Sequence, residues 1–346
     1  VIMKMLAMRI HHLGPVGSTE YPLRLDTIEV PEPAPGEVLI KVHACGVCHT
    51  ELDEIEGRTA PETLPMTPGH QVVGTVVREG RGCRVALQGQ RVGIAWIHSA
   101  CGECSWCREG RENLCPDFRA TGRDAQGGYA EYMVMPETFV HPLPHDIDDL
   151  DATPLLCAGA VGFRSLDMCR LQNGQRLGLT GFGASGHLVL QMARHLYPDS
   201  PVSVFARSSK EREFAHDLGA EWAGETTDRP EYFLDAIIDT TPAWLPVLSA
   251  MEALAPGGRL IINAIRKEAG DHDRLAELDY ERHLWREKSI ISVANVTRRD
   301  VRECLRLAVE IPLKPRVTDY RLDQANTALT ELKQGHIRGA KVLRIS

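Results

Sequence analysis

Aromatic side chains are scarce in this chain of 346 residues, and no long run of apolar or of basic residues occurs in it. Phe, Trp and Tyr make up only 5% of the sequence, which argues against stacking platforms for bases. The formal net charge is -8 and no cluster of Lys or Arg stands out, so nucleic acid is not an expected partner. No apolar stretch reaches the length of a membrane span, and the N-terminal segment does not fit a secretory signal. We therefore expect a cytoplasmic protein without a membrane partner.

The length and the cysteine content narrow the class further. A chain of 346 residues is long for one domain and comfortable for two, and a hydrophobic share of 43% is typical of a soluble globular protein. Ten cysteines in a chain without a secretory signal indicate thiols and metal ligands rather than disulfides. Four of them are expected to be small buried or half-buried side chains without chemistry, namely Cys45, Cys83, Cys169 and Cys304.

The segment CGECSWCREGRENLC holds four cysteines with spacers of two, two and seven residues, namely Cys101, Cys104, Cys107 and Cys115. Short spacers let neighbouring thiolates turn toward one ion, and four sulfurs complete a tetrahedron without an open position, so a structural zinc is favoured. An iron–sulfur site also begins with this spacing and ends in Cys-Pro, as this segment does, but its last spacer is shorter. A disulfide knot would need an oxidising compartment. A zinc ribbon for nucleic acid would have basic surroundings, whereas this segment is mixed in charge.

A second candidate metal group is spread over three segments, CGVCHTEL (45–52), PGHQVVG (68–74) and LLCAGAVGF (155–163). Their ligand types are two sulfurs and one nitrogen, from Cys48, His70 and Cys157. That set suits a zinc with one position left for water or substrate. Spacing alone supports this site weakly, because a single Cys or His in an apolar stretch is more often a core residue.

The order of apolar runs divides the chain into two parts. The first half holds short strand-like runs between Pro and Gly, such as VLIKVHACGV and QVVGTVV, which indicate a β-rich domain whose loops carry the metal ligands. After about residue 155, strand-like runs alternate with helical ones, which is typical of βαβ units and a parallel sheet. We therefore predict an α/β chain made of a β-rich domain and a doubly wound parallel-sheet domain.

A glycine-rich turn lies at the start of the alternating part. LTGFGASG (179–186) follows a strand-like run and precedes a helical one, and it spaces Gly181, Gly183 and Gly186 as G-x-G-x-x-G. These glycines allow the tight turn, the approach of a pyrophosphate and the packing of helix on strand, while the helix N-terminus faces the phosphates. The motif alone is weak, but its place in the alternation predicts a site for a nicotinamide dinucleotide.

The end of the next strand bears on the choice between the two nicotinamide cofactors. An acid at this position would hold the ribose 2′-hydroxyl of NAD, but here the run VSVFA is followed by Arg207 and then by two serines. A guanidinium and hydroxyls suit a 2′-phosphate, so NADP is favoured over NAD. The alternative is a basic helix start that is simply exposed to solvent.

The segments CGVCHTEL and PGHQVVG, their order and the four-cysteine segment that follows resemble the zinc-containing, medium-chain alcohol dehydrogenases over nearly the whole chain. The resemblance implies a discontinuous GroES-like catalytic domain, residues 1–155 and 317–346, and a Rossmann domain for the cofactor, residues 156–316. It implies two zinc ions per chain, a catalytic one on the group that contains Cys48 and a structural one on the four-cysteine segment. The implied activity is hydride transfer between NAD(P) and a primary or secondary alcohol, aldehyde or ketone.

The resemblance also implies roles for single residues near the first metal ligand. Thr50 matches the hydroxyl that relays the proton, and His49 matches a position that contacts the cofactor pyrophosphate. Relatives often carry a histidine three residues after that threonine. This chain has Asp53 there, so the relay is expected to end in an exposed carboxylate or in water. Glu51 stands where relatives have Asp and is expected to orient His70 through its second ring nitrogen.

Two positions correspond to the substrate pocket of the yeast-type enzymes. Trp96 matches a tryptophan that lines that pocket, with an ordinary core tryptophan as the alternative, and Ile55 replaces a second pocket tryptophan. An apolar pocket wider than one built only for ethanol is therefore expected. Because dimers and tetramers both occur in this family, a homodimer or homotetramer is expected, with SIISVANVTRR (289–299) as a candidate edge strand for pairing.

Two other functions compete with an alcohol dehydrogenase that takes a small alcohol or carbonyl substrate. A polyol dehydrogenase of the same superfamily often has a glutamate where this chain has Cys157, which counts against it. A non-catalytic NADP-binding regulatory protein would not need the intact ligand group together with Thr50.

Overall fold

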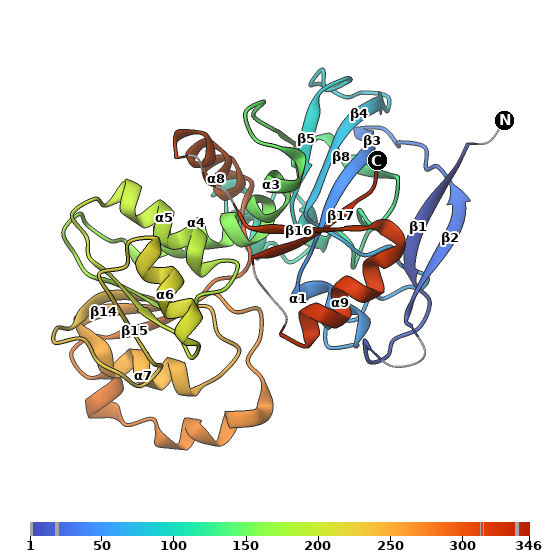
Figure 1. Cartoon of the computed structure of the whole chain (residues 1–346). Helices are drawn as coiled ribbons and strands as arrows, with labels where there is room; N and C mark the ends of the chain where they lie inside the picture. The colour runs from blue at the N-terminus through green and yellow to red at the C-terminus, as the bar shows by residue number, and fades with distance from the viewer. Residues whose placement is uncertain (1–2, 18–20, 312, 314, 336–338) are drawn as a thin grey trace. The chain divides into compact units, whose positions relative to one another are not determined.

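The computed structural model describes residues 3–17, 21–311, 313, 315–335 and 339–346 (Figure 1). The chain forms two compact units. Unit 1 comprises Val1–Cys157, Val296–Val309 and Lys314–Ser346, and unit 2 comprises Ala158–Asn295 and Glu310–Leu313.

Unit 1 is the β-rich unit. Its strands are β1 (Lys4–Ile10), β2 (Leu23–Glu29), β3 (Glu37–Val47), β4 (Val72–Glu79), β5 (Arg91–Ile94), β6 (Ile97–Ser99), β7 (Arg119–Ala120), β8 (Tyr132–Pro136), β9 (His141–Pro142), β16 (Val317–Arg321) and β17 (Ala340–Arg344). Its helices and helical turns are α1 (His49–Ile55), α2 (Ser105–Arg108), η1 (Glu112–Leu114), η2 (Glu137–Phe139), α3 (Asp149–Pro154), α8 (Arg298–Glu310), η6 (Leu322–Gln324) and α9 (Ala325–Lys333). A π-helical turn, η3 (Leu155–Gly159), crosses the boundary to unit 2.

The main sheet of unit 1 has the strand order β16-β17-β3-β4-β5-β9, and β8 also pairs with β3. β16 and β17 pair in parallel, whereas β3 pairs in antiparallel with β4, β8 and β17. The long central strand β3 reads EVLIKVHACGV, and most of its side chains are buried, because branched apolar residues fit a covered pleated surface. Each fully buried aliphatic side chain contributes about 1.5–3 kcal/mol to stability. The buried strand therefore fixes the backbone position of the residue that follows Val47.

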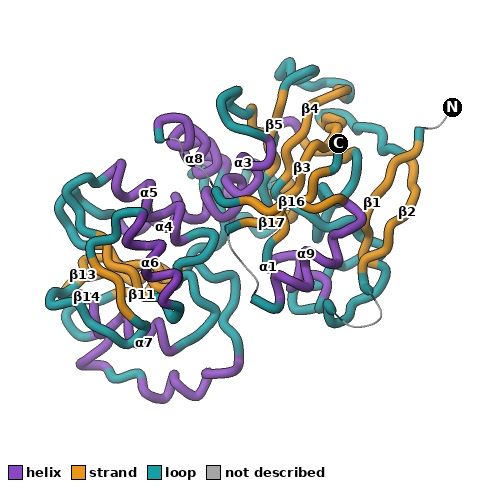
Figure 2. The backbone as a smooth tube through the Cα atoms, viewed as in Figure 1, coloured by secondary structure: helices purple, strands orange, loops and turns teal. Residues whose placement is uncertain are grey.

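Unit 2 is a doubly wound α/β unit. Its strands are β10 (Leu177–Thr180), β11 (Val202–Phe205), β12 (Trp222–Gly224), β13 (Leu234–Asp239), β14 (Leu254–Ile262) and β15 (Ser289–Ser292). Its helices are α4 (Ala160–Cys169), α5 (Gly186–Leu196), α6 (Ser209–Asp217) and α7 (Leu245–Ala253), followed by the turns η4 (Ala269–Glu277) and η5 (Tyr280–Leu284). Figure 2 shows helices and strands alternating along this unit.

The six strands of unit 2 pair in parallel in the order β12-β11-β10-β13-β14-β15. This is the order of a dinucleotide-binding sheet, in which the strand order reverses between β10 and β13. The inner strands LGLT and VSVF are buried at every position, as expected of parallel strands covered on both faces. The predicted α/β architecture, a β-rich domain and a doubly wound parallel sheet, is confirmed.

The observed units differ from the predicted domains over residues 296–309. The sequence pattern assigned this segment, most of α8, to the cofactor-binding part, whereas it belongs to unit 1. Contacts within unit 1 explain the difference. Glu112 Oε1 accepts from the backbone N of Arg298 at 2.9 Å and from its Nε at 3.0 Å. Cys304 Sγ donates to the carbonyl oxygen of Leu155 at 3.6 Å.

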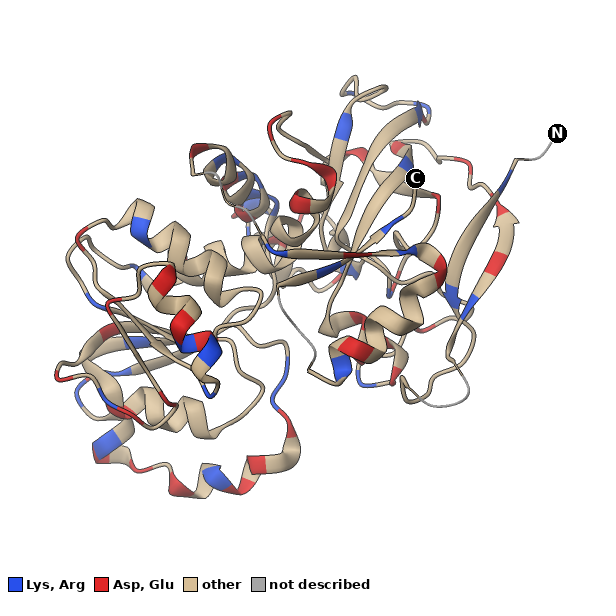
Figure 3. Cartoon of the chain, viewed as in Figure 1, with Lys and Arg blue, Asp and Glu red and all other residues tan. Residues whose placement is uncertain are grey.

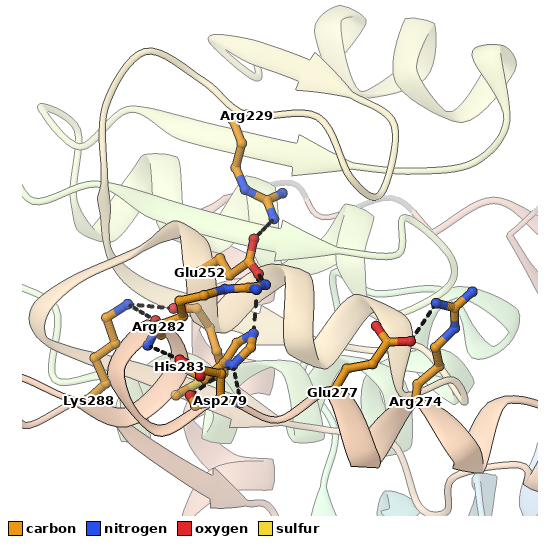
Figure 4. Close-up of polar contacts among 9 residues, drawn as sticks. Arg229, Glu252, Arg274, Glu277, Asp279, Arg282, His283 and Lys288 are labelled. Atoms are coloured by element: carbon orange, nitrogen blue, oxygen red, sulfur yellow. Dashed lines mark hydrogen bonds and ion pairs between the residues drawn. The ribbon is translucent and has the colours of Figure 1, made fainter.

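An ion-pair network in unit 2 joins η5 to α7 (Figure 4). Oε2 of Glu252 lies 3.2 Å from Arg229 Nη2, while its Oε1 accepts from Arg282 and lies 3.3 Å from Nε2 of His283. Partial burial opposes ionisation, but the hydrogen bonds of Arg282 and Arg229 hold the pKa of Glu252 below its ordinary value. Lys288 Nζ donates to the carbonyl oxygen of Arg282 at 3.1 Å. The network fixes the segment that leads into β15.

No helix in the described part of the chain is both long and apolar enough to span a membrane. Basic and acidic side chains are interspersed on several elements, for example along α6 (Figure 3).

Candidate active site

The junction of β3 and α1 holds the first candidate ligand. Cys48 follows the strand as the N-cap of α1, with extended backbone at φ -140°. Its Sγ accepts from the backbone N of Thr50 at 3.4 Å, while Glu51 Oε2 accepts from the backbone N of Cys48 at 2.8 Å. This is a capping box in which a thiol stands in for the usual hydroxyl. The backbone N–H groups at the start of the helix would stabilise a thiolate on Cys48 once a cation has displaced its proton.

His70 is placed by a turn that glycine permits. Gly69 has φ +101°, and a Cβ at this position would lie 2.4 Å from the ring of Tyr129. The imidazole of His70 is buried, with Nε2 3.7 Å from Cys48 Sγ and Nδ1 2.6 Å from Glu51 Oε1. Burial lowers the pKa of His70, but the charges of Glu51 and Cys48 outweigh it and raise that pKa well above its ordinary value. The predicted role of Glu51 in orienting His70 is confirmed.

Cys157 lies where the chain passes from α3 to α4. Pro154 is the last residue of α3, and the next five residues form the π-helical turn η3, a conformation often found at functional sites. The ligand atoms of Cys48, His70 and Cys157 all lie within 4.8 Å of one another. With zinc–ligand bonds of about 2.0–2.3 Å, tetrahedral zinc separates its ligand atoms by about 3.5–3.8 Å. The spacing and the donor types of the three side chains therefore fit a zinc site with one open position.

Without a metal ion, the surroundings of this cluster keep the Cys48 thiol protonated. A hydrogen bond with Cys157 and burial raise the pKa of the Cys48 thiol well above its ordinary value. Because thiols bind metals as thiolates, a divalent ion would displace these protons and stabilise the buried negative charges. Two thiolates then balance the charge of one zinc ion, with Glu51 as a further negative group behind His70.

The second cluster consists of four cysteines whose sulfur atoms lie close together. Sγ of Cys101 lies 3.9 Å from that of Cys107 and 3.5 Å from that of Cys115, and with Cys104 all four sulfurs lie within 4.8 Å of one another. The backbone N–H groups of Glu103 and Cys104 lower the pKa of Cys101 to about 7, which makes the thiolate accessible at neutral pH. Four sulfurs without an open position fit a structural zinc.

The glycine motif in unit 2 has the geometry of a phosphate-binding turn. Gly181 has φ +81°, and a Cβ on it would lie 2.6 Å from Thr240 Oγ1. A Cβ on Gly186, the first residue of α5, would lie 2.8 Å from the carbonyl oxygen of Gly181. A Cβ on Gly183 would meet nothing within 4 Å, so its backbone faces open space where a pyrophosphate could approach. The three glycines thus fit the three tasks that the motif assigns to them.

Arg207 is exposed in the short connection between β11 and α6. Arg212 stiffens this connection, since its Nη1 donates to the carbonyl oxygens of Ala206 at 2.8 Å and Arg207 at 3.0 Å. The connection reads Ala-Arg-Ser and holds no acid to accept from a ribose 2′-hydroxyl. His49, the first residue of α1 in unit 1, is exposed.

Comparison with known proteins agrees with this geometry. Residues 34–145 match the family model described as alcohol dehydrogenase GroES-like domain. The chain is 43% identical over 347 residues to the probable alcohol dehydrogenase AdhA of Mycobacterium tuberculosis (strain CDC 1551 / Oshkosh), with 99% of this chain and 97% of the relative covered. This chain belongs to the zinc-containing, medium-chain alcohol dehydrogenase family.

Two further known proteins match this chain over nearly its whole length. An alcohol dehydrogenase of Geobacillus stearothermophilus is 31% identical over 338 residues, with 93% of this chain and 96% of the relative covered. The crystal structure of AibC matches this medium-chain dehydrogenase with a TM-score of 0.87 at 25% identity, covering 99% of this chain and 96% of that chain.

The structure corrects the expected setting of Asp53, the counterpart of the family's relay histidine. Its side chain is fully buried rather than exposed, and its Oδ1 accepts from Arg58 Nε at 2.6 Å. Arg58 also binds Glu56, just after the end of α1. The backbone folds back here, because the carbonyl oxygen of Asp53 accepts from the backbone N of Arg58 and of Thr59. Asp53 thus holds the turn after the helix.

The two residues expected at the substrate pocket have different settings. Ile55 is fully buried in the hydrophobic core of unit 1, so it does not line an open pocket. Its apolar side chain packs inside unit 1, and its carbonyl oxygen accepts from the backbone N of Gly14. Trp96 is half-buried, with its ring centre 4.8 Å from that of Phe118 and the Arg123 guanidinium 5.4 Å above it. Arg123 is an additional polar neighbour of this position that the sequence did not indicate.

The sequence reading also missed Glu54. This residue of α1 is fully buried, and neither of its carboxylate oxygens has a hydrogen-bond partner among the described residues. A signal was present in the sequence, because ELDEIE (51–56) places four acids on less than two turns of the helix and its cap. Acids at that density on a short helix next to a metal ligand cannot all face solvent.

Proposed function

We propose that this protein is a zinc-dependent alcohol dehydrogenase that transfers hydride between NADP(H) and a primary or secondary alcohol, aldehyde or ketone. The observation that carries the proposal is the meeting of Cys48, His70 and Cys157 in one cluster with the donor set of an open zinc site. A polyol dehydrogenase is disfavoured by the thiol of Cys157. A regulatory protein without activity would gain nothing from a three-ligand metal site.

The residues around the cluster have separate tasks in this proposal. Cys48, His70 and Cys157 would hold the zinc, whose charge lowers the pKa of an alcohol in the fourth position. Glu51 keeps the imidazole of His70 oriented. Thr50, two residues after Cys48 on α1, accepts the proton of the alcohol hydroxyl. The four-cysteine cluster would hold a second zinc that stabilises its segment.

NADP is the proposed cofactor, in preference to NAD. The turn with Gly181, Gly183 and Gly186 would bind the pyrophosphate. The exposed Arg207 and the two serines that follow it at the start of α6 offer a charge and donors to a 2′-phosphate. No acid in the connection competes for the ribose hydroxyl.

A homodimer or homotetramer in the cytoplasm is the proposed working form. The last strand of the six-stranded sheet, β15, supports this idea, because the described residues pair it on one side only. Ile290 on this strand is 40% exposed, as a side chain at an uncovered edge would be.

The test of the proposed function is a panel of primary and secondary alcohols, aldehydes and ketones offered with NADP(H) and with NAD(H). Turnover is followed by the absorbance of the reduced nicotinamide. We expect turnover with the zinc-loaded protein, its loss after treatment with a chelator, and its return with zinc. Zinc-loaded protein that turns over no member of the panel with either cofactor would overturn the proposal.

A further inference from the structure

Glu54 is a buried acid that has no task in the proposed function. Its side chain is fully buried in unit 1, and both carboxylate oxygens are without a hydrogen-bond partner among the described residues. A buried carboxyl group without partners is costly, and a polar group in this state usually contacts bound water or has a functional role. The other acids of α1 and its cap are engaged.

The other three acids of this segment all have partners. Glu51 contacts the backbone N of Cys48 and the imidazole of His70, and Asp53 accepts from Arg58. Glu56 accepts from the backbone N of Val16 and from Lys333 and Arg58, outside the ligand cluster. Among the four acids of ELDEIE (51–56), all of which the structure describes, Glu54 is the one whose carboxylate has neither a hydrogen bond nor an ion pair.

The position of Glu54 on α1 relates it to the proton of the reaction. With 3.6 residues per turn, residue 54 lies about 40° around the helix from residue 50 and about 60° from residue 51. Glu54 therefore stands one turn beyond Thr50, on the face between Thr50 and Glu51.

A second orphaned polar atom lies in the same region. The Tyr129 hydroxyl is buried without a hydrogen-bond partner among the described residues. The tyrosine is tied to the turn before His70, because its backbone N donates to Pro68 O at 3.0 Å and its ring lies against Gly69. The charge of Glu54 helps to raise the pKa of Tyr129, which links the two buried groups, and a bound water with its two to four polar contacts would satisfy both.

The charged and titratable groups that face Glu54 come from three elements. They are Glu51 on α1, His70 after the Gly69 turn, and Arg123 with Asp124 in the loop after β7. The charge of Glu54 is also among the causes that raise the pKa of Tyr129. Burial, followed by the charge of Glu51, raises the pKa of Glu54 well above its ordinary value, and His70 and Arg123 oppose the rise only in part. A carboxyl group of this kind exchanges its proton nearer to neutral pH than an exposed glutamate does.

We propose that Glu54 receives the proton of alcohol oxidation from Thr50, through water bound between Glu54 and the Tyr129 hydroxyl. This inference rests on the proposed function. A bound nicotinamide cofactor would take the hydride from the alcohol carbon as the carbonyl forms, and Thr50 Oγ1 accepts the proton that the alcohol hydroxyl gives up. Thr50 passes its own hydroxyl proton to the water, and the water passes a proton to the Glu54 carboxylate. In the reducing direction the same proton returns along the same groups.

The test compares Glu54→Gln with Glu56→Gln. Glu56 lies two residues further along the chain and outside the ligand cluster, so its substitution is a control that removes the same charge. Glu54 must be ionised to accept a proton, so wild-type oxidation should fall as the pH drops through the pKa of Glu54. We expect Glu54→Gln to flatten this acidic limb and to lower kcat for oxidation about ten- to a hundredfold, the lower part of the range for general acid–base groups. KM for the alcohol and zinc content should stay at wild-type values. Glu56→Gln should keep the wild-type profile.

Infrared difference spectroscopy supplies a readout apart from turnover. A buried protonated carboxyl group should give a carbonyl band that titrates in the wild type, is absent in Glu54→Gln and remains in Glu56→Gln. Tyr129→Phe keeps the ring and removes one water contact, so it should shift that band and weaken the acidic limb even if Glu54→Gln does not fold.

Three results would overturn the inference. One is an unchanged profile and kcat in Glu54→Gln, another is a carbonyl band that survives this substitution, and the third is a profile that moves in Asp53→Asn alone. In each of these cases the wild type is still an active, zinc-dependent enzyme, so the inference would be wrong while the proposed function would stand. A wild type without turnover would instead overturn the proposed function, and the infrared titration would still test Glu54.

Discussion

At the scale of single residues, Glu51 joins two candidate zinc ligands, because it accepts from the backbone N of Cys48 and lies 2.6 Å from Nδ1 of His70. Glu51→Gln should weaken both contacts, since an amide has one acceptor oxygen and no charge. We expect the affinity of this site for zinc to fall about ten- to a hundredfold, as for other partners behind ligating histidines. Competition with a chelator measures it, with Glu56→Gln as the control. Equal affinities in both variants would mean that His70 keeps its orientation without Glu51.

Arg207 is the residue on which the proposed cofactor preference depends. Arg207→Asp removes a partner of the 2′-phosphate and adds an acceptor for a ribose hydroxyl. A charge-assisted hydrogen bond is worth about 1.5–3 kcal/mol, so NADP(H) should bind roughly ten- to a hundredfold more weakly, and NAD(H) should bind better. Binding titrations with both cofactors measure this, and Arg274→Asp, at another exposed arginine of unit 2, controls for the change in charge. A wild type that prefers NAD(H) strongly would already refute the preference.

Single residues also show what the sequence could and could not predict. Cys48 and His70 stand in short motifs whose spacing carries the chemistry, so their proximity could be anticipated. The settings of Asp53, Glu54 and Ile55 could not, because α1 is covered by segments distant in sequence. Gly14 donates to Ile55 O, and Lys333 binds the acid at the end of the helix. A helix of seven residues carries too short a pattern to reveal which of its faces such segments bury.

At the scale of structural elements, the four-cysteine segment from β6 to β7 has little apolar interior of its own and relies on its cluster. Cys107→Ser should release one zinc and lower the thermal midpoint of unfolding clearly, because loss of a metal site belongs to the changes that exceed about 4 kcal/mol. Cys83→Ser is the matched control, since the thiol of Cys83 is half-buried and donates to Glu37 O at 3.4 Å. Calorimetry measures the thermal midpoint of each variant, and metal analysis measures its zinc content. Equal midpoints for the two variants would mean that the cluster carries no folding free energy.

The elements themselves were predictable where a pattern was long and local. The apolar runs that became β3, β4, β10 and β11 stand out in the sequence, and so does the alternation with helices. The short strand β12 escaped prediction, because its three residues are WAG and carry no periodic signal. The assignment of α8 to unit 1 depends on side chains such as Arg298, which finds Glu112 186 residues away, and no local pattern reveals such a partner.

At the scale of the whole molecule, the two kinds of chemistry are divided between the units. Both candidate metal clusters belong to unit 1, and the glycine motif belongs to unit 2. We therefore expect two zinc ions per chain with different consequences when each is lost. Loss of the open site should abolish chemistry and leave stability, whereas loss of the closed site should reduce stability.

The most direct test of this central claim is the zinc content of Cys48→Ser measured on the same samples as its turnover and its thermal midpoint. We expect two zinc ions per chain in the wild type, and one in the variant with nearly all turnover lost. The midpoint of the variant should stay close to that of the wild type, because the closed cluster is untouched. A variant that kept both zinc ions and full turnover would contradict the assignment of Cys48, His70 and Cys157 as the catalytic metal site.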